Sequence, residues 1–223
     1  MVDFFEKNKK NIIILGILLL CLLLFVIFTS CNKKTKYINT IKSHNKSSLP
    51  HINIQSDNIE KINKKLKNEY EEIIDLNNES YFKYEYSYSN DVLSLLIEKG
   101  IKESENDFLE VEYKVYNISV IDKKSLEKDD IIALYDLDES NIKQTIESEL
   151  QKQYNKEISD GYIPVEECKY SCFLEDKNYT SINDNVELFV KDDKVYGYLN
   201  IKNGSLYYDL NDYPTTKKIY ELK

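Results

Sequence analysis

The sequence predicts an α+β fold in which antiparallel sheet is packed against two long amphipathic helices on one face. Two segments repeat apolar residues every three or four positions, which is the period of a helix. Several others alternate apolar and polar residues and are separated by short turns, which is typical of antiparallel strands. Strand segments outnumber helical ones, so we expect the helices to cover one face of the sheet.

An uncharged apolar run of 17 residues, Ile12 to Phe28, precedes this part of the chain. As a helix it extends about 25 Å, and residues 29–31 bring it to about 30 Å, the thickness of a hydrocarbon core. The run is apolar all round, whereas a soluble core helix carries one apolar stripe. We therefore predict a short cytoplasmic head at 1–10 and a membrane segment at 11–31.

Two interpretations of this segment remain open. A lysine-bearing head, an apolar run and Phe28-Thr29-Ser30-Cys31 resemble a bacterial lipoprotein signal, which implies lipidation of Cys31. The run is longer than the 7–15 residues of a typical cleaved signal, which favours an uncleaved single-pass anchor. Either outcome tethers the chain to a membrane. Lysines lie on both sides of the run, so charge alone leaves the orientation open.

Residues 32–50 are polar and basic and end at Pro50, so we expect a flexible stalk before a domain at 51–223. That domain has 22 Lys, no Arg and 37 Asp plus Glu, a balance of −15. Such a charge repels nucleic acid and favours cationic proteins, neutral glycans or metal ions as partners.

The first half of the domain begins with a short strand at 51–55. Ser56 or Asp57 then caps a helix to about Leu76, with an apolar face at spacings of three and four. This face contains Ile59, Ile62, Leu66, Tyr70 and Ile73. Residues 81–89 and 92–97 follow as a hairpin, then a loop at 99–106 and a strand at 108–120.

The second half has a connector at 125–137 with a helical turn. Asp138 or Ser140 caps a second long helix to about Ile158, with Ile142, Ile146, Leu150 and Tyr154 on one face. Residues 161–180 are predicted to be irregular. Strands at 186–190, 194–201 and 205–210 are expected to form a terminal meander.

From about residue 49 to 223 the chain resembles the extracytoplasmic domain of RsiV-like membrane anti-sigma factors and PdaC-like peptidoglycan deacetylases. The similar stretches are LPHIN, NIEKINKKLKNEYEE, FKYEYSYSNDVLSLLIE, NISVIDKKSLEKDDII, NIKQTIESELQKQ and VELFVKDDKVYGYLNI. The resemblance implies a two-part α+β domain outside the cell that binds peptidoglycan or a wall-directed protein such as lysozyme. The family often has a Gly/His-rich loop where this chain has EKGIKESEND, without histidine.

Few residues indicate chemistry, so we expect a binding domain without catalysis, cofactor or metal. The alternative is a structural envelope lipoprotein or assembly partner, and a wall-polymer hydrolase that uses carboxylates is less favoured because no matched carboxylate pair is identifiable. His44 and His51 flank the predicted stalk and are interpreted as solvated, so we expect no histidine-based metal site or triad in the folded domain. Cys168 and Cys172 are either a small disulfide loop in an oxidising exterior or two free thiols. The pairs Asp129-Asp130, Asp192-Asp193 and Glu71-Glu72 are interpreted as solvated surface charge.

The alternating tyrosines Tyr84, Tyr86 and Tyr88 are the strongest candidate for a binding site. An exposed aromatic stripe can stack on sugar rings. The alternative, which we favour from sequence, is that the stripe packs under a helix with its hydroxyls reaching polar groups at the rim. With only four Phe beyond the membrane run, tyrosine must supply much of the core's aromatic volume.

Overall fold

The computed structural model describes residues 36–76, 78–102, 104, 109–161, 169–201 and 219–222. The chain divides into two compact units, Met1–Lys36 and Tyr37–Lys223, and the helices and strands described here belong to the second. The predicted membrane run 12–28 and Cys31 lie outside the described residues. Among the described helices, none has the length and apolar character needed to span a bilayer.

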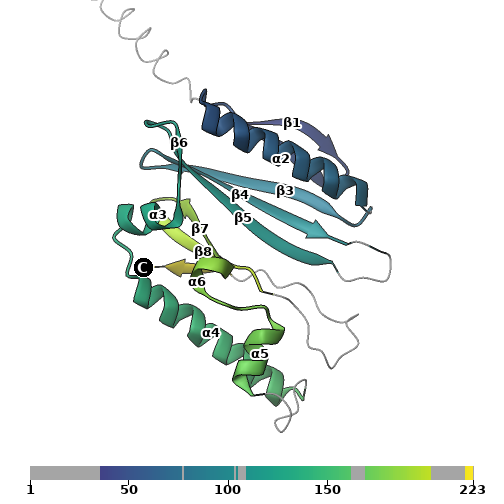
Figure 1. Ribbon diagram of the computed structural model, residues 1–223, viewed down its shortest axis with the longest axis vertical. Helices are drawn as coiled ribbons and strands as arrows, with labels where there is room; N and C mark the ends of the chain where they lie inside the picture. The colour runs from purple at the N-terminus through teal and green to yellow at the C-terminus, as the bar shows by residue number, and fades with distance from the viewer. Residues whose placement is uncertain are drawn as a thin grey trace, which may run out of the picture. The chain divides into compact units, whose positions relative to one another are not determined.

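The described strands pair only in antiparallel fashion, so the predicted α+β class with antiparallel sheets is confirmed (Figure 1). The elements in chain order are β1 (Ile38–His44), β2 (Ser47–Ile52), α2 (Asp57–Leu76), β3 (Tyr81–Ser89), β4 (Val92–Ile101), β5 (Glu110–Ser119), β6 (Lys124–Leu126), α3 (Lys128–Leu134), α4 (Glu139–Ser159), α5 (Tyr170–Asp176), α6 (Ile182–Asn185), β7 (Val186–Lys191), β8 (Lys194–Leu199) and β9 (Ile219–Leu222). They form a β1-β2 hairpin, a four-stranded β3-β4-β5-β6 sheet and a three-stranded β7-β8-β9 sheet.

Two tight hairpins set the register of the larger sheets. Ser89 pairs with Val92 across Asn90 and Asp91, whose φ angles are 47° and 62°. Lys191 pairs with Lys194 across Asp192 and Asp193 in the same way. Asn and Asp tolerate the left-handed region better than other non-glycine residues, which suits them to two-residue hairpin turns.

Helix α2 and the β1-β2 hairpin cover one face of the four-stranded sheet. The five predicted apolar residues of α2 are all buried. They pack with the odd-numbered residues Leu93, Leu95 and Ile97 of β4. Asn63 of α2 holds the hairpin because its amide accepts from the Ile52 N–H (2.9 Å) and donates to the Ile52 carbonyl (3.0 Å).

The hairpin corrects the prediction of a flexible stalk through Pro50. Ile38 on β1 and Leu49 and Ile52 on β2 are buried in the same cluster as α2. From Thr40 to His44, β1 is exposed and, apart from Ile41, polar, so its composition is similar to that of a linker. Burial of one face of β2 outweighs that composition and orders the segment.

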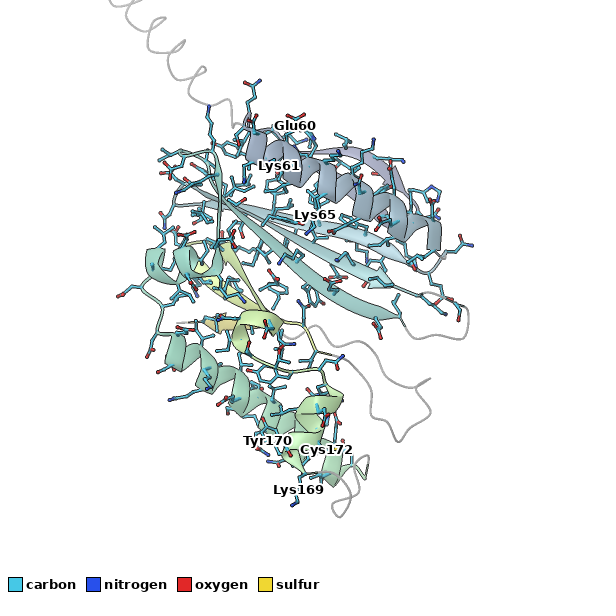
Figure 2. All side chains as sticks on the ribbon, in the orientation of Figure 1. Glu60, Lys61, Lys65, Lys169, Tyr170 and Cys172 are labelled. Carbon is cyan, nitrogen blue, oxygen red and sulfur yellow. The ribbon has the colours of Figure 1, made fainter. Side chains whose placement is uncertain are left out.

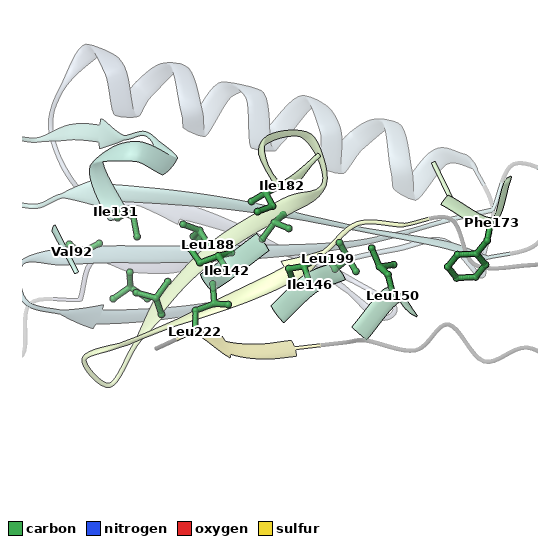
Figure 3. Close-up of a cluster of buried hydrophobic side chains, with 13 residues drawn as sticks. Val92, Ile131, Ile142, Ile146, Leu150, Phe173, Ile182, Leu188, Leu199 and Leu222 are labelled. Atoms are coloured by element: carbon green, nitrogen blue, oxygen red, sulfur yellow. The ribbon is translucent and has the colours of Figure 1, made fainter. Parts of the chain in front are cut away.

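Helix α4 packs on the three-stranded sheet rather than beside α2, so the two long helices do not share one face as predicted. Ile142, Ile146 and Leu150 are buried against Leu188 of β7 and Leu199 of β8 (Figure 3). The reason lies in β4, which is buried on both of its faces. Since the face of the first sheet away from α2 is already covered, α4 covers the second sheet.

The two sheets meet through a third cluster of buried residues, which contains Leu96, Tyr113, Val115, Phe189 and Tyr198. Beside it, the Ser94 hydroxyl donates to the Asn117 side chain (2.6 Å) and accepts from the Val190 N–H (3.0 Å). Asn117 in turn donates to the Leu188 carbonyl (2.9 Å). Side chains of the first sheet therefore make the hydrogen bonds to main-chain groups of β7 that a neighbouring strand would otherwise make.

Several boundaries differ from the sequence predictions. Strand β4 continues through Ile101, across part of the expected loop at 99–106. The segment expected to be irregular contains α5, whose Phe173 is buried against α4. Strand β9 was not predicted, and the strand predicted at 205–210 lies outside the described residues.

Candidate functional site

The tyrosine stripe of β3 begins in the core and ends in solvent. Phe82 is fully buried and Tyr84 is half-buried, whereas Tyr86 and Tyr88 are 42% and 45% exposed. All four share the face of the sheet that α2 and the β1-β2 hairpin cover, because side chains alternate along a strand. Packing in the core, the favoured alternative, therefore applies to Phe82 and Tyr84. An exposed aromatic stripe, the other alternative, applies to Tyr86 and Tyr88.

Contacts from residues near β1 and from the hairpin turn hold the stripe in place. The Tyr84 hydroxyl lies 2.6 Å from the Thr40 hydroxyl. The rings of Tyr37 and Tyr88 are 4.8 Å apart and tilted by 42°. The Tyr88 hydroxyl donates to Asp91 (2.7 Å), and this hydrogen bond to a carboxylate raises the pKa of Tyr88. Rings fixed in this way lose little entropy when a ligand stacks on them.

Charged side chains lie on β3 and around the turn that follows it. Glu85, on the opposite face of β3, forms an ion pair with Lys191 of β7 (2.7 Å). The Lys83 ammonium lies 4.2 Å from the centre of the Tyr81 ring, where the electron-rich face attracts a cation. At the exposed end, Asp91 accepts from the Tyr88 hydroxyl and Asp193 accepts from the Ser89 hydroxyl, so two carboxylates lie beside the platform.

A second polar cluster lies between α2 and the far end of the same sheet. Lys99 of β4 is nearly buried and contacts Glu112 (2.9 Å) and Glu69 (3.7 Å). Burial and the nearby Glu69 raise the pKa of Tyr116, whose hydroxyl is buried without a hydrogen-bond partner among the described residues. Both carboxylates neutralise Lys99, so we interpret this cluster as an ion network that anchors α2 to the sheet.

The histidines and cysteines considered as candidates for chemistry do not form a common site among the described residues. His44 is exposed and His51 is half-buried, both in the β1-β2 hairpin. Within the described part of the chain, no three His, Cys, Asp or Glu side chains are grouped to hold a metal ion. Cys172 lies on α5 (Figure 2). It is disulfide-bonded, and Cys168, its predicted partner, lies outside the described residues.

The acidic pairs serve turns and helix ends. Asp130 accepts a hydrogen bond from the Glu127 N–H at the start of α3. Asp193 accepts from the Ser89 hydroxyl, and the Asp193 N–H donates back to that oxygen (2.9 Å). Glu71, on α2, lies 3.8 Å from Lys42 of β1. These contacts are structural, and none places two carboxylates on a common substrate position.

Sequence reasoning missed Tyr37 and Thr40, which support the stripe from the segment interpreted as a stalk. The signal that could have found them is the apolar pattern Tyr37-Ile38, Leu49 and Ile52 around the polar Asn45-Lys46 turn. Comparisons with known protein families and with curated proteins find no match for this chain. Membership of the RsiV/PdaC-like family therefore stays a prediction from sequence.

Proposed function

We propose that the chain is a membrane-tethered, non-catalytic binding protein whose domain lies outside the cell and recognises a cell-wall glycan. The observation that carries this proposal is the pair of exposed rings, Tyr86 and Tyr88, on one face of β3. Residues two apart on a strand are about 7 Å apart, so neighbouring sugar rings can each meet one tyrosine. The phenol hydroxyls add polar contacts at the rim of the platform.

The proposed cellular location of the domain rests on its sequence. The apolar run at 12–28 supports a tether, and the resemblance to RsiV-like and PdaC-like domains supports an extracytoplasmic position. The same resemblance supports peptidoglycan as the glycan and recognition, rather than bond cleavage, as the activity. The platform lies at the exposed end of β3, where a large polymer has access.

The test is a calorimetric titration of the full chain in detergent with soluble peptidoglycan fragments. We expect Tyr86→Ala and Tyr88→Ala each to weaken binding at least tenfold, since each removes a stacking surface. Tyr86→Phe keeps the ring and is expected to stay within about threefold of the parent. Ile121→Ala, at an exposed site in the β5-β6 turn, serves as the distant control. Equal affinity for all four variants, or no binding by the parent chain, would overturn the proposal.

A cationic, wall-active protein such as lysozyme is the second candidate ligand. The specific observation in its favour is the balance of −15 over residues 51–223, which steers positively charged partners toward the domain. Titration with lysozyme at two salt concentrations separates the candidates. Strongly salt-dependent binding supports the protein ligand, whereas salt-independent binding of glycan fragments supports stacking.

A further inference from the structure

A carboxylate is in direct contact with one of the two exposed rings of the platform, Tyr86 and Tyr88. The Tyr88 hydroxyl donates to the Asp91 side chain at 2.7 Å. Asp91 lies in the tight turn after β3, and its main-chain carbonyl accepts from the Val120 N–H at 2.9 Å. The turn is therefore held from two sides, and the Asp91 carboxylate stays at the hydroxyl edge of the Tyr88 ring.

The turn between β7 and β8 brings a second carboxylate to the same end of β3. Asp193 accepts from the Ser89 hydroxyl, and the Asp193 N–H donates to the Ser89 oxygen at 2.9 Å. Ser89 directly follows Tyr88 along the strand. Asp192, the neighbour of Asp193 in this turn, is exposed as well.

Neither Asp91 nor Asp193 forms an ion pair within the part of the chain that the structure describes. The lysines on the surrounding segments are Lys36, Lys83, Lys123, Lys124, Lys191 and Lys194. Lys191 is paired with Glu85 at 2.7 Å, and Lys124 with Asp122 at 3.9 Å. The two carboxylates beside the platform are therefore available to a cation from outside the domain.

An exposed tyrosine ring next to a carboxylate attracts a cation in two ways. The electron-rich face of the ring attracts the positive charge, and the carboxylate adds a Coulomb attraction over a few ångströms. A sugar with a neutral acetamido group gains only the stacking contact. A sugar with a protonated amino group gains stacking together with both attractions.

We propose that the platform prefers a glycan whose sugars carry free, protonated amino groups. This inference rests on the proposed function, in which the platform binds a glycan. One sugar ring stacks on Tyr86, while the ammonium group of its neighbour lies against the Tyr88 ring and the Asp91 carboxylate. Side chains two residues apart on a strand are about 7 Å apart, so neighbouring sugars can make both contacts. Asp193 and the balance of −15 over residues 51–223 attract further ammonium groups of the polymer.

The row of two exposed rings favours a glycan over a cationic protein as the source of the ammonium group. A lysine side chain can place an ammonium beside Tyr88 and Asp91, but it has no ring to stack on Tyr86. A polymer of amino sugars supplies a ring and a positive charge at every repeat. Lysozyme therefore serves as the competing ligand in the test.

The experiment is a calorimetric titration of the full chain in detergent with two β-1,4-linked tetramers, one of glucosamine and one of N-acetylglucosamine. At about pH 5.5 the amino groups are protonated and exposed aspartates are ionised. We expect the parent chain to bind the glucosamine tetramer at least about fivefold more tightly at low salt. The preference should shrink at high salt, because the added attraction is electrostatic.

Asp91→Asn removes the charge with little change of shape. Asparagine accepts a hydrogen bond from Tyr88 as aspartate does, and it tolerates the φ of 62° at this position. The variant should bind the glucosamine tetramer about three- to tenfold more weakly and the acetylated tetramer within about twofold of the parent. With Asp193→Asn added, the two tetramers should bind about equally. Asp75→Asn, at an exposed site in the last turn of α2, makes the same change of charge and should keep the parent's preference.

The outcomes separate this inference from the proposed function. If both tetramers bind equally well to the parent, the inference is wrong and the glycan platform stands. If neither tetramer binds, the glycan platform itself is overturned, and the inference with it. A preference that Asp91→Asn and Asp75→Asn reduce equally would show that the charge of the whole domain, rather than the platform, attracts the amine. An effect of Asp91→Asn on lysozyme binding alone would also overturn the inference, in favour of a cationic protein.

Discussion

At the scale of single residues, Asn117 joins the two larger sheets. Its side chain is 6% exposed, accepts from Ser94 and donates to the Leu188 carbonyl. Asn117→Ala leaves that carbonyl buried without its donor, and an unsatisfied buried group costs about 1–3 kcal/mol. We expect the free energy of unfolding, measured by urea denaturation, to fall by about 2–3 kcal/mol once the lost packing is included.

The matched control for this prediction is Asn141→Ala. Asn141 is exposed in the first turn of α4, and its side chain makes no hydrogen bond among the described residues. A surface substitution of this type changes stability by no more than about 0.5 kcal/mol. Equal effects of the two substitutions would show that Asn117 contributes no more than a surface amide.

Ionisation of Tyr113 is expected to lower the stability of the domain at alkaline pH. Burial at the junction of the sheets raises the pKa of its phenol to about 12, against about 10 in an unfolded chain. Between pH 10 and 12 the unfolded chain releases this proton while the folded chain retains it, so the free energy of unfolding falls as pH rises. Below pH 10 both states keep the proton and this contribution is constant.

The measurement is urea denaturation of the parent and of Tyr113→Phe from pH 8 to 12. The parent should lose stability more steeply above pH 10 than the variant, which has no phenol to ionise at this position. The slope is reduced rather than abolished, since burial also raises the pKa of Tyr198 and Tyr116. Parallel curves for the two proteins would contradict a buried, neutral Tyr113.

At the scale of elements, α5 is fastened to α4 by a buried ion pair. The Lys177 ammonium is 2% exposed, lies 3.2 Å from Glu157 and is 5.2 Å from the centre of the Phe173 ring. Lys177→Met leaves the Glu157 carboxylate buried without its cation, and is expected to lower the free energy of unfolding by about 3–5 kcal/mol. The double substitution Lys177→Met/Glu157→Leu should recover most of that loss in urea denaturation, because neither charge remains.

The control for the ion pair is Lys143→Met, which breaks the exposed contact between Lys143 and Glu147 at 3.9 Å. Exposed pairs of this kind contribute about 0.3–0.5 kcal/mol. A double variant as unstable as Lys177→Met alone would show that packing, rather than charge pairing, holds α5.

The elements predicted correctly are those whose burial follows one period. Helices α2 and α4 each bury one face, and the β3-β4 hairpin has a turn sequence that fits its geometry. The β1-β2 hairpin was missed because Ile38, Leu49 and Ile52 are spread among polar residues and become buried only against α2. Helix α5 is only seven residues long and has no side-chain cap hydrogen bond, so its sequence shows neither a helical period nor a start signal.

The candidate site was predictable only in part for a related reason. Alternation placed Phe82 and the three tyrosines on one face, but it could not show where the cover from the hairpin ends. That limit depends on Tyr37 and Thr40, which contact β3 from more than 40 residues earlier in the chain.

At the scale of the whole described domain, the cluster between the sheets determines whether the two halves fold together. Phe189 of β7 is buried there, with its ring centre 6.0 Å from that of Tyr198 in an edge-to-face arrangement. One half has its own cluster around α2 and the other has its own around α4. Since β4 contributes to all three clusters, through Leu93, Leu96 and Val92, we expect the halves to unfold in a single transition.

Phe189→Ala should therefore lower the protection of α2 and α4 by the same amount, about 3–5 kcal/mol, in native-state hydrogen exchange. Phe189→Leu, which should cost about 1–1.5 kcal/mol, keeps the test valid if the alanine variant fails to fold. Ile121→Ala, at an exposed site, should change neither helix. If protection falls in α4 while α2 keeps its parent value, the halves are separate folding units, and the cluster between the sheets is a docking surface rather than part of a common core.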